Sequence, residues 1–414
     1  MQPIPGGSVA SFRSEFILPS ENGREQVYFL GNSLGLQPKR AAARLQQVLE
    51  GWGHLGVEAY FEGGEPWLEY HDLLAPPLAR IVGALPQEVV VMNSLSVNLH
   101  LMLVSFYRPR GRRNKILCEA KAFPSDQYVL ETHTRQRGLD PADVIIEVGP
   151  REGETWIRQE DILDALHRHR HELALVFWGG VSYYTGQVFD LEGITRAAHE
   201  AGIPVGFDLA HAAGNIPLAL HHWGVDFACW CHYKYLNAGP GAIAGAFIHE
   251  RHHSDKELNR FAGWWGYRRD ERFRMQKGFR PQPGAEGWHL SAPSPLLCAP
   301  LRASLELFME AGPEALFQQG QQLSDHLLSV IAGVNRRLGA PAIRVLTPAD
   351  AKGCQVSLLI EKGARSVFEH LGASGVFSDW REPGVIRVAP VPLYNTFYEV
   401  EELGRILEEG VRKV

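Results

Sequence analysis

The chain has 414 residues, of which 45% are hydrophobic and 21% charged, and its formal net charge is −6. This composition excludes a disordered chain, and the length is typical of roughly two or three domains. The slightly acidic balance also disfavours a nucleic-acid partner, although arginines cluster at 110–113 and 268–274.

Several other sequence features restrict the class of protein. No uncharged apolar stretch is long enough to cross a membrane, and residues 1–7 lack the pattern of a secretory signal. The five cysteines are few and scattered, and their spacing does not suggest disulfide pairs, which is typical of reduced thiols. Histidines cluster at 167–171, 221–222 and 249–253 without zinc-ligand spacing, so we interpret them as surface helix residues and expect no metal site. We therefore expect a cytoplasmic protein with no membrane partner.

In chain order, short apolar runs alternate with amphipathic stretches through the middle of the sequence. The runs predict strands at 88–92, 115–119, 144–148, 173–178, 204–208, 227–230 and 245–249. The amphipathic stretches predict helices at 96–106, 125–137, 159–168 and 191–201. This alternation predicts an α/β fold with a mainly parallel central sheet covered by helices on both faces.

The two ends of the chain have a different pattern. A helix at 39–52 follows a glycine-bounded turn, and a Pro/Gly-rich passage at 279–295 precedes predicted helices at 300–311 and 317–338. Strands are predicted at 354–360 and 385–388. We expect a large α/β domain at 56–295, a small α+β domain at 296–414, and an N-terminal segment, 1–55, that packs with the small domain.

Candidate chemistry lies where the strands end, because ligands of open α/β sheets bind at the carboxyl ends of the strands. Asp208 closes one apolar strand, and Lys234 follows another between two tyrosines. The chain has only nine lysines, and the other eight stand in polar or loop-like surroundings. Burial lowers the pKa of an amine and makes it a nucleophile for Schiff-base formation. The pair suggests a pyridoxal phosphate site, with a buried structural ion pair as the alternative.

Three further strand ends carry polar or aromatic residues. Ser96 could cap the helix that follows the first strand and form an anion site there. Phe123 could stack on a cofactor ring beside Asp126, although Ser125 or Asp126 could simply cap a helix. Arg387 alternates with apolar residues in a strand, as expected of an arginine that holds a carboxylate.

Several long blocks together resemble the kynureninase family of fold-type-I pyridoxal-phosphate enzymes. The strongest block runs from Pro204 to His211 and continues from Trp223 through Tyr233, Lys234 and Asn237. The other blocks lie at 28–35, 96–100, 121–126, 184–187, 263–264 and 386–395. The resemblance covers nearly the whole chain.

The resemblance implies a set of site residues. Lys234 would carry the cofactor, Asp208 would pair with its ring nitrogen, and His211 would lie beside them. Leu95 and Ser96 would contact the phosphate, and Tyr233 would bind the phosphate and act as a candidate proton donor. The remaining implied residues are Phe123 on the ring, Asp126 as its polar neighbour, Trp264 from the partner subunit, Arg387 on the substrate carboxylate, and Asn32, Ser33 and Tyr60 on the substrate.

Two positions depart from the family pattern. Gly179 stands where relatives tend to carry a serine that bonds the cofactor. Ala292 stands where some relatives have an asparagine near the aryl end of the substrate, so the preference between kynurenine and its 3-hydroxy form stays open.

The resemblance also implies an activity and an assembly. The activity is hydrolytic cleavage of the Cβ–Cγ bond of L-kynurenine or 3-hydroxy-L-kynurenine, which releases an anthranilate and L-alanine in tryptophan catabolism or NAD biosynthesis. The implied assembly is a homodimer with shared active sites. A cysteine desulfurase or an aminotransferase would share Lys234 and Asp208, and a catalytically silent homodimer used as a scaffold is the alternative from another class.

Overall fold

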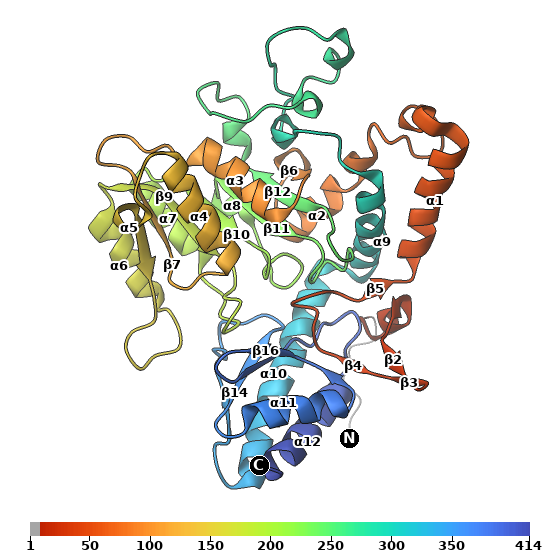
Figure 1. Ribbon diagram of the computed structural model, residues 1–414, viewed down its shortest axis with the longest axis vertical. Coiled ribbons are helices and arrows are strands. Elements are labelled where there is room, and N and C mark those ends of the chain that lie inside the picture. Colours follow the sequence, from red (N-terminus) through yellow and green to blue (C-terminus); the bar gives the residue numbers. More distant parts are fainter. Residues whose placement is uncertain (1–8) are drawn as a thin grey trace.

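The computed structural model describes residues 9–414, and its largest element is a seven-stranded sheet (Figure 1). Strand β12 is antiparallel to both of its neighbours, and the other adjacent pairs are parallel. In spatial order the strands are β6 (Val89–Val91), β12 (Ala244–Ile248), β11 (Phe227–Cys231), β10 (Val205–Asp208), β9 (Leu173–Gly179), β7 (Lys115–Glu119) and β8 (Ile145–Val148). The predicted mainly parallel α/β sheet is confirmed.

Helices cover both faces of this sheet, which explains why its strands are apolar runs rather than alternating patterns. In β11 every residue is buried, and successive side chains join different hydrophobic clusters. Phe227 and Cys229 belong to one cluster, and Ala228 and Trp230 to the other. The helices of this part are α2 (Ala75–Val82), α3 (Leu95–Phe106), α4 (Pro124–Gln136), α5 (Pro141–Val144), α6 (Gln159–His169), α7 (Leu191–Glu200) and α8 (Leu220–Trp223).

A second, four-stranded antiparallel sheet lies in the C-terminal part, at the bottom of Figure 1. Its spatial order is β13 (Ile343–Val345), β14 (Val356–Ile360), β17 (Val385–Val388) and β16 (Asp379–Arg381). A separate hydrophobic cluster joins this sheet to α10 (Pro313–Leu338), α11 (Ala364–Ala373) and α12 (Phe397–Arg412).

The N-terminal segment lies against this C-terminal part. Strand β4 (Val27–Tyr28) pairs in parallel with β15 (Val376–Phe377), and Leu30 forms a bridge to Ala389. Helix α1 (Arg40–Leu55) packs along α9 (Pro295–Ala311), as the right side of Figure 1 shows. Two short ribbons complete the segment, β1 (Phe16–Ile17) with β5 (Gln37–Pro38) and β2 (Ser20–Glu21) with β3 (Arg24–Glu25).

The predicted elements agree with the structure to within a few residues, with some corrections at their ends. Helix α9 begins at Pro295 and contains Pro300, where the sequence predicted the start of the helix. Ser96 does not cap α3, because Ser94 occupies the N-cap position and Ser96 lies in the first turn. Phe123 occupies the N-cap position of α4, so the prediction that Ser125 or Asp126 caps this helix is wrong. The sequence pattern missed α2, α5, α8, α11, α12 and the short strands β1 to β5, β13, β15 and β16.

Two interpretations of the sequence concern membranes and signals. Among residues 9–414, no helix combines the length and the apolar character that crossing a bilayer requires. The interpretation of residues 1–7 falls outside the described residues.

Helix α12 allows a test of the C-terminal core. Leu407 is fully buried there, whereas Tyr398 on the same helix is 76% exposed. We expect Leu407→Ala to lower the free energy of unfolding by about 2–5 kcal/mol because it leaves a cavity. Urea unfolding followed by fluorescence measures this change, with Tyr398→Ala as the matched control. Equal effects of the two substitutions would show that α12 does not pack as described.

Candidate active site

A cavity of about 150 Å³ lies at the carboxyl ends of the parallel strands of the large sheet. Its position is the one at which open α/β sheets bind ligands, because the loops leaving the strands diverge there. The lining residues are Ser94, Leu95, Ser96, Glu119, Phe123, Ser125, Asp126, Gly179, Val181, Tyr183, Asp208, Ala210, His211, Tyr233 and Lys234. The structure therefore brings together nine of the predicted site residues.

Lys234 provides the only primary amine in this lining. It follows β11 and is 9% exposed, and its Nζ lies 5.8 Å from the centroid of the Phe123 ring and 6.0 Å from that of Tyr233. Among residues 9–414 this amine forms no hydrogen bond and no ion pair, and its described contacts are with the two rings. It is consequently free to react with a carbonyl group.

Lys352 corrects the expectation that only Lys234 is embedded. Lys352 is 6% exposed, but its amine forms an ion pair with Asp325 and donates a hydrogen bond to the carbonyl of Ala349. A paired ammonium is a poor nucleophile, so burial alone does not identify the reactive lysine.

Two buried carboxyl groups, Asp208 and Asp126, lie side by side at the floor of the cavity and share a hydrogen bond. Burial and then the repulsion from Asp208 raise the pKa of Asp126 well above its usual range, and burial also raises the pKa of Asp208. The backbone N–H of Ala210 donates to Asp208 Oδ1 over 2.7 Å, while Asp126 Oδ1 has no partner among the described residues. The pair can therefore share a proton between its carboxyl groups and accept a hydrogen bond from a protonated basic group in the cavity.

Glu119 is a third carboxyl group in the cavity, and the sequence reasoning did not single it out. Burial raises the pKa of Glu119 to about 7, against a hydrogen bond from Ser182 that lowers it. A Cβ added at Gly179 would lie 3.3 Å from Glu119 Oε2, so the glycine leaves room for this carboxyl group. Glu119 closes strand β7, the same position in its strand that drew attention to Asp208.

His211 and Tyr233 both keep their neutral forms. Burial, and then the charges of Lys234 and Arg387, hold the pKa of His211 well below its usual range. Its Nδ1 has no partner in the described part of the chain. Burial raises the pKa of Tyr233, so its hydroxyl retains a proton that it can donate.

The N-terminus of α3 lies at another side of the cavity. Ser94 provides no side-chain cap, so the first-turn N–H groups around Leu95 and Ser96 face the cavity without a partner from the helix. Free N–H groups and the helix dipole together favour an anion at this place.

Arg387 approaches the cavity from β17 of the small sheet. It is 1% exposed, donates to the carbonyl of Tyr183 over 2.6 Å and forms an ion pair with Asp379. Ser33 donates to the same carboxylate of Asp379 over 3.1 Å. The Nε of Arg387 has no partner among the described residues, which leaves one donor for a bound carboxylate. Asn32 was also expected to bind the substrate, but its amide donates a hydrogen bond to Gln355 over 3.0 Å.

Three predicted residues lie in a different cavity of the single chain. Tyr60, Trp264 and Ala292 line a hollow of about 700 Å³ whose other walls are mostly apolar. Trp264 is 47% exposed, and Phe61 and Phe273 beside it are each 52% exposed. The single chain does not bring these three residues to Lys234.

Two solved structures share the fold of this chain. The chain is similar to a cystine C-S lyase complexed with its product cysteine persulfide, with a TM-score of 0.76, 18% identity and coverage of 93% of this chain and 97% of that one. It is also similar to an apo cysteine desulfurase from Thermococcus onnurineus, with a TM-score of 0.75, 17% identity and full coverage of both chains. A family model described as "Aminotransferase class-V" matches residues 78–338. These similarities define the class of the fold.

Closer relatives define the family. The chain is 50% identical to a kynureninase from Flavobacterium psychrophilum, over 97% of this chain and 94% of that protein. It is 54% identical to a kynureninase from Stenotrophomonas maltophilia, over 94% of this chain and 92% of that protein. A model of the kynureninase C-terminal domain matches residues 317–407. The chain belongs to the kynureninase family.

The raised pKa of Glu119 predicts a pH dependence of stability. The pKa of Glu119 is about 7 in the folded chain, whereas the ordinary pKa of a glutamate, which applies in the unfolded chain, is 4.5. Between these values the folded state holds more protons, so the free energy of unfolding falls as the pH rises, by up to roughly 3 kcal/mol. We expect the melting temperature of the cofactor-free protein to fall less steeply from pH 5 to pH 8 in Glu119→Gln than in the unmodified chain. Parallel pH profiles of the two proteins would contradict the assignment.

Proposed function

We propose that the cavity around Lys234 binds pyridoxal 5'-phosphate and that this chain hydrolyses the Cβ–Cγ bond of L-kynurenine or 3-hydroxy-L-kynurenine. Water and the substrate give anthranilate, or its 3-hydroxy form, together with L-alanine. The observation that carries the proposal is the unpaired amine of Lys234 beside the buried carboxyl pair of Asp208 and Asp126. Identity near 50% to kynureninases over almost the whole chain supports the same substrate class.

The donor set of the cavity fits the cofactor. An unpaired amine suits its aldehyde, and the buried carboxyl group of Asp208 suits its ring nitrogen. The half-exposed ring of Phe123 offers a stacking surface, and the α3 N-terminus offers N–H groups to the phosphate. The unsatisfied atoms of Asp126 and His211 point to a polar occupant. A neighbouring solved structure of the same fold carries glycine covalently linked to its pyridoxal-phosphate cofactor.

When bound, pyridoxal phosphate supplies an electron-poor ring that accepts the electrons released at the substrate Cα. Lys234 would hold the cofactor through its amine, and the same amine would move the proton of the substrate Cα. Asp208 keeps a proton on the ring nitrogen, because a buried carboxylate stabilises a neighbouring cation. Arg387 orients the substrate by its carboxylate through the free Nε. Tyr233 donates a proton to the carbon that loses the aryl ketone group.

The thiols disfavour the alternative activity of a cysteine desulfurase. Such an enzyme needs a reactive cysteine on a mobile loop, and all five cysteines here are buried. Burial raises the pKa of Cys354 to about 12, which keeps this thiol unreactive. The complete set of lysine, carboxyl and arginine groups likewise disfavours a catalytically silent scaffold.

We further propose a homodimer in which the partner completes each site. The support is the exposed apolar surface around Trp264, where Val57, Phe61 and Phe273 line the same hollow and are each more than half exposed. Phe261 and Met275, close to Trp264 in sequence, are also more than half exposed. Surfaces of this kind mark protein interfaces. The segment between β12 and α9 that carries most of them extends away from the sheet at the top of Figure 1. Residues 56–295 and 296–414 would act as the large and small domains around the site, with 1–55 on the small domain, and the enzyme would work in the cytoplasm.

Removal of the amine tests the proposed activity. We expect Lys234→Ala to reduce anthranilate formation from L-kynurenine by more than about a thousandfold, because no other primary amine lines the cavity to hold the cofactor. Anthranilate fluorescence measures the rate, and circular dichroism checks the fold. The matched control is Lys256→Ala, an exposed loop lysine, which should keep full activity. A Lys234→Ala protein that forms anthranilate at the normal rate would disprove the proposal.

Mixing inactive variants tests the shared site. Trp264→Ala should bind the cofactor weakly, and Lys234→Ala should be inactive. If Trp264 acts on the partner's cavity, a mixed dimer has one intact site, and exchange of subunits should restore about a quarter of the activity. Lys234→Ala mixed with Asp208→Asn is the control without recovery, because both residues belong to one cavity. Absence of recovery in the first mixture would place Trp264 in the site of its own chain.

A further inference from the structure

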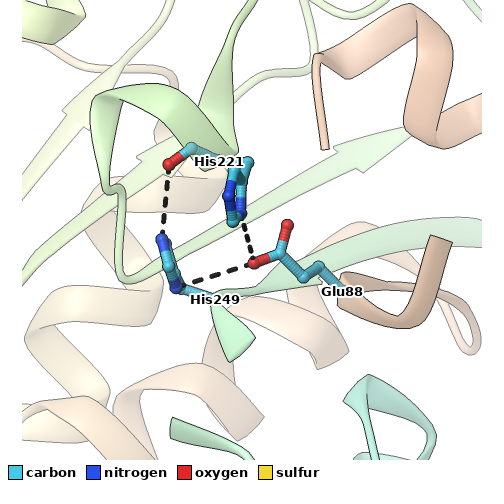
Figure 2. Close-up of side chains that lie close together, drawn as sticks. All are labelled: Glu88, His221 and His249. Carbon is cyan, nitrogen blue, oxygen red and sulfur yellow. Dashed lines mark hydrogen bonds and ion pairs between the residues drawn. The ribbon is translucent and has the colours of Figure 1, made fainter. Parts of the chain in front are cut away.

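Glu88, His221 and His249 form a cluster at the amino-terminal edge of the large sheet, the edge opposite the candidate active site (Figure 2). Glu88 ends the short helix η4 (Pro86–Glu88) and directly precedes β6, whose other end leads to the active-site helix. His221 lies in α8, and His249 directly follows β12. These histidines were interpreted from the sequence as surface helix residues, and this interpretation is wrong for His249, which precedes a turn and is only 12% exposed in its side chain.

The three side chains place one ligand atom each close together. Glu88 Oε1 lies 2.9 Å from His221 Nδ1 and 3.6 Å from His249 Nδ1, and the three atoms all lie within 4.8 Å of one another. Because none of these separations exceeds 4.8 Å, a point in the plane of the three atoms can lie about 2.4 Å or less from each, which is compatible with the bond lengths of zinc to nitrogen and oxygen. The two imidazole rings are stacked, with centroids 5.0 Å apart and planes inclined by 20°.

The charge of Glu88 also favours a cation. Its carboxyl group is 0% exposed, and no lysine or arginine forms an ion pair with it in the described part of the chain. Its other partners are the backbone N–H groups of Leu85 and Glu250, each at 2.9 Å. The two backbone N–H groups stabilise the carboxylate, and a divalent cation would in addition balance its charge.

The hydrogen bonds of His249 orient it as a ligand. Its Nε2 lies 3.3 Å from the carbonyl oxygen of His221, so it donates there and leaves the Nδ1 lone pair toward Glu88 (Figure 2). A metal-bound imidazole commonly donates its other N–H to a carbonyl in this way. The Nδ1 also accepts a long hydrogen bond, 3.3 Å, from the backbone of Arg251, and a metal ion would replace that bond.

We propose that Glu88 Oε1, His221 Nδ1 and His249 Nδ1 bind one divalent transition-metal ion, with zinc as the best fit to two imidazoles and one carboxylate. His221 is about one third exposed in its side chain, so solvent reaches the fourth position. The ion joins η4, α8 and the end of β12, three segments that are distant in sequence, and it stabilises the folded chain.

A second cluster shows what a site without a metal looks like. His71, Asp72 and Glu286 also place three ligand atoms within 4.8 Å of one another. There the guanidinium of Arg269 forms ion pairs with both carboxylates, at 2.6 Å and 2.8 Å, and supplies the positive charge. Glu88 has no such arginine.

Zinc binding to the full-length holoenzyme tests the proposal. The protein is treated with a chelator, dialysed against zinc sulfate of increasing concentration and analysed for bound metal. We expect one saturable zinc ion per chain in the unmodified protein and at least about tenfold weaker binding in His221→Ala and in His249→Phe. The matched control is His222→Ala, an exposed neighbour on the same helix, which should bind zinc as the unmodified protein does.

Two further measurements keep the result unambiguous. Zinc should raise the melting temperature of the unmodified protein and of His222→Ala, and it should leave that of His221→Ala unchanged. Anthranilate formation should be normal in His221→Ala, since the cluster lies across the sheet from the cavity. Even if His249→Phe folds poorly, the more exposed His221 decides the outcome. Absence of a saturable ion in the unmodified protein, or equal zinc affinity in His221→Ala, would overturn the proposal.

Discussion

The burial of carboxyl groups around a single free amine is the constraint on which the active site depends. Glu119 ends β7, Asp208 ends β10 and Asp126 lies in the first turn of α4, and all three are buried, where a lone negative charge is strongly destabilised. Their raised pKa values show that the chain meets this constraint in part by keeping protons on them. A cationic ring bound next to Asp208 would stabilise the remaining negative charge. Cofactor binding and the charge balance of the buried site are therefore coupled. The parallel strands bring Glu119 and Asp208 to the same edge of the sheet, because the carboxyl ends of parallel strands all lie there, and the start of α4 adds Asp126.

The small sheet contributes the opposite charge. Arg387 and Asp379 face each other across β17 and β16, and Arg387 reaches the loop that lines the cavity through the carbonyl of Tyr183. A buried arginine held in this way is oriented before a substrate arrives, which lowers the entropic cost of binding its carboxylate. The two sheets thus have different roles. The large sheet carries the groups that fit a cofactor, and the small sheet carries the arginine that fits a substrate carboxylate.

Much of this arrangement could be predicted from the sequence, and the exceptions have physical causes. Lys234 and Asp208 could be predicted because Asp208 closes one apolar strand and Lys234 follows shortly after another. Glu119 could have been found by the same rule, since it closes β7. Helix α12 also carries a visible signal, the capping box of Thr396 and Glu399. Asp379 gave no signal, because its strand is three residues long and its partner is set by sheet register. The cluster of Glu88, His221 and His249 could not be predicted, since only the topology brings residues so distant in sequence together. Residues at a subunit interface, such as Trp264, need a second chain to be placed.

The most direct test of the central claim is to identify the lysine that carries the cofactor. Reduction of the holoenzyme with borohydride fixes the pyridoxyl group on its amine, and peptide mass mapping then locates it. We predict the added mass on the peptide that contains Lys234, with one group per chain. A pyridoxyl group on the paired Lys352 or on any other lysine, or no added mass at all, would contradict the account.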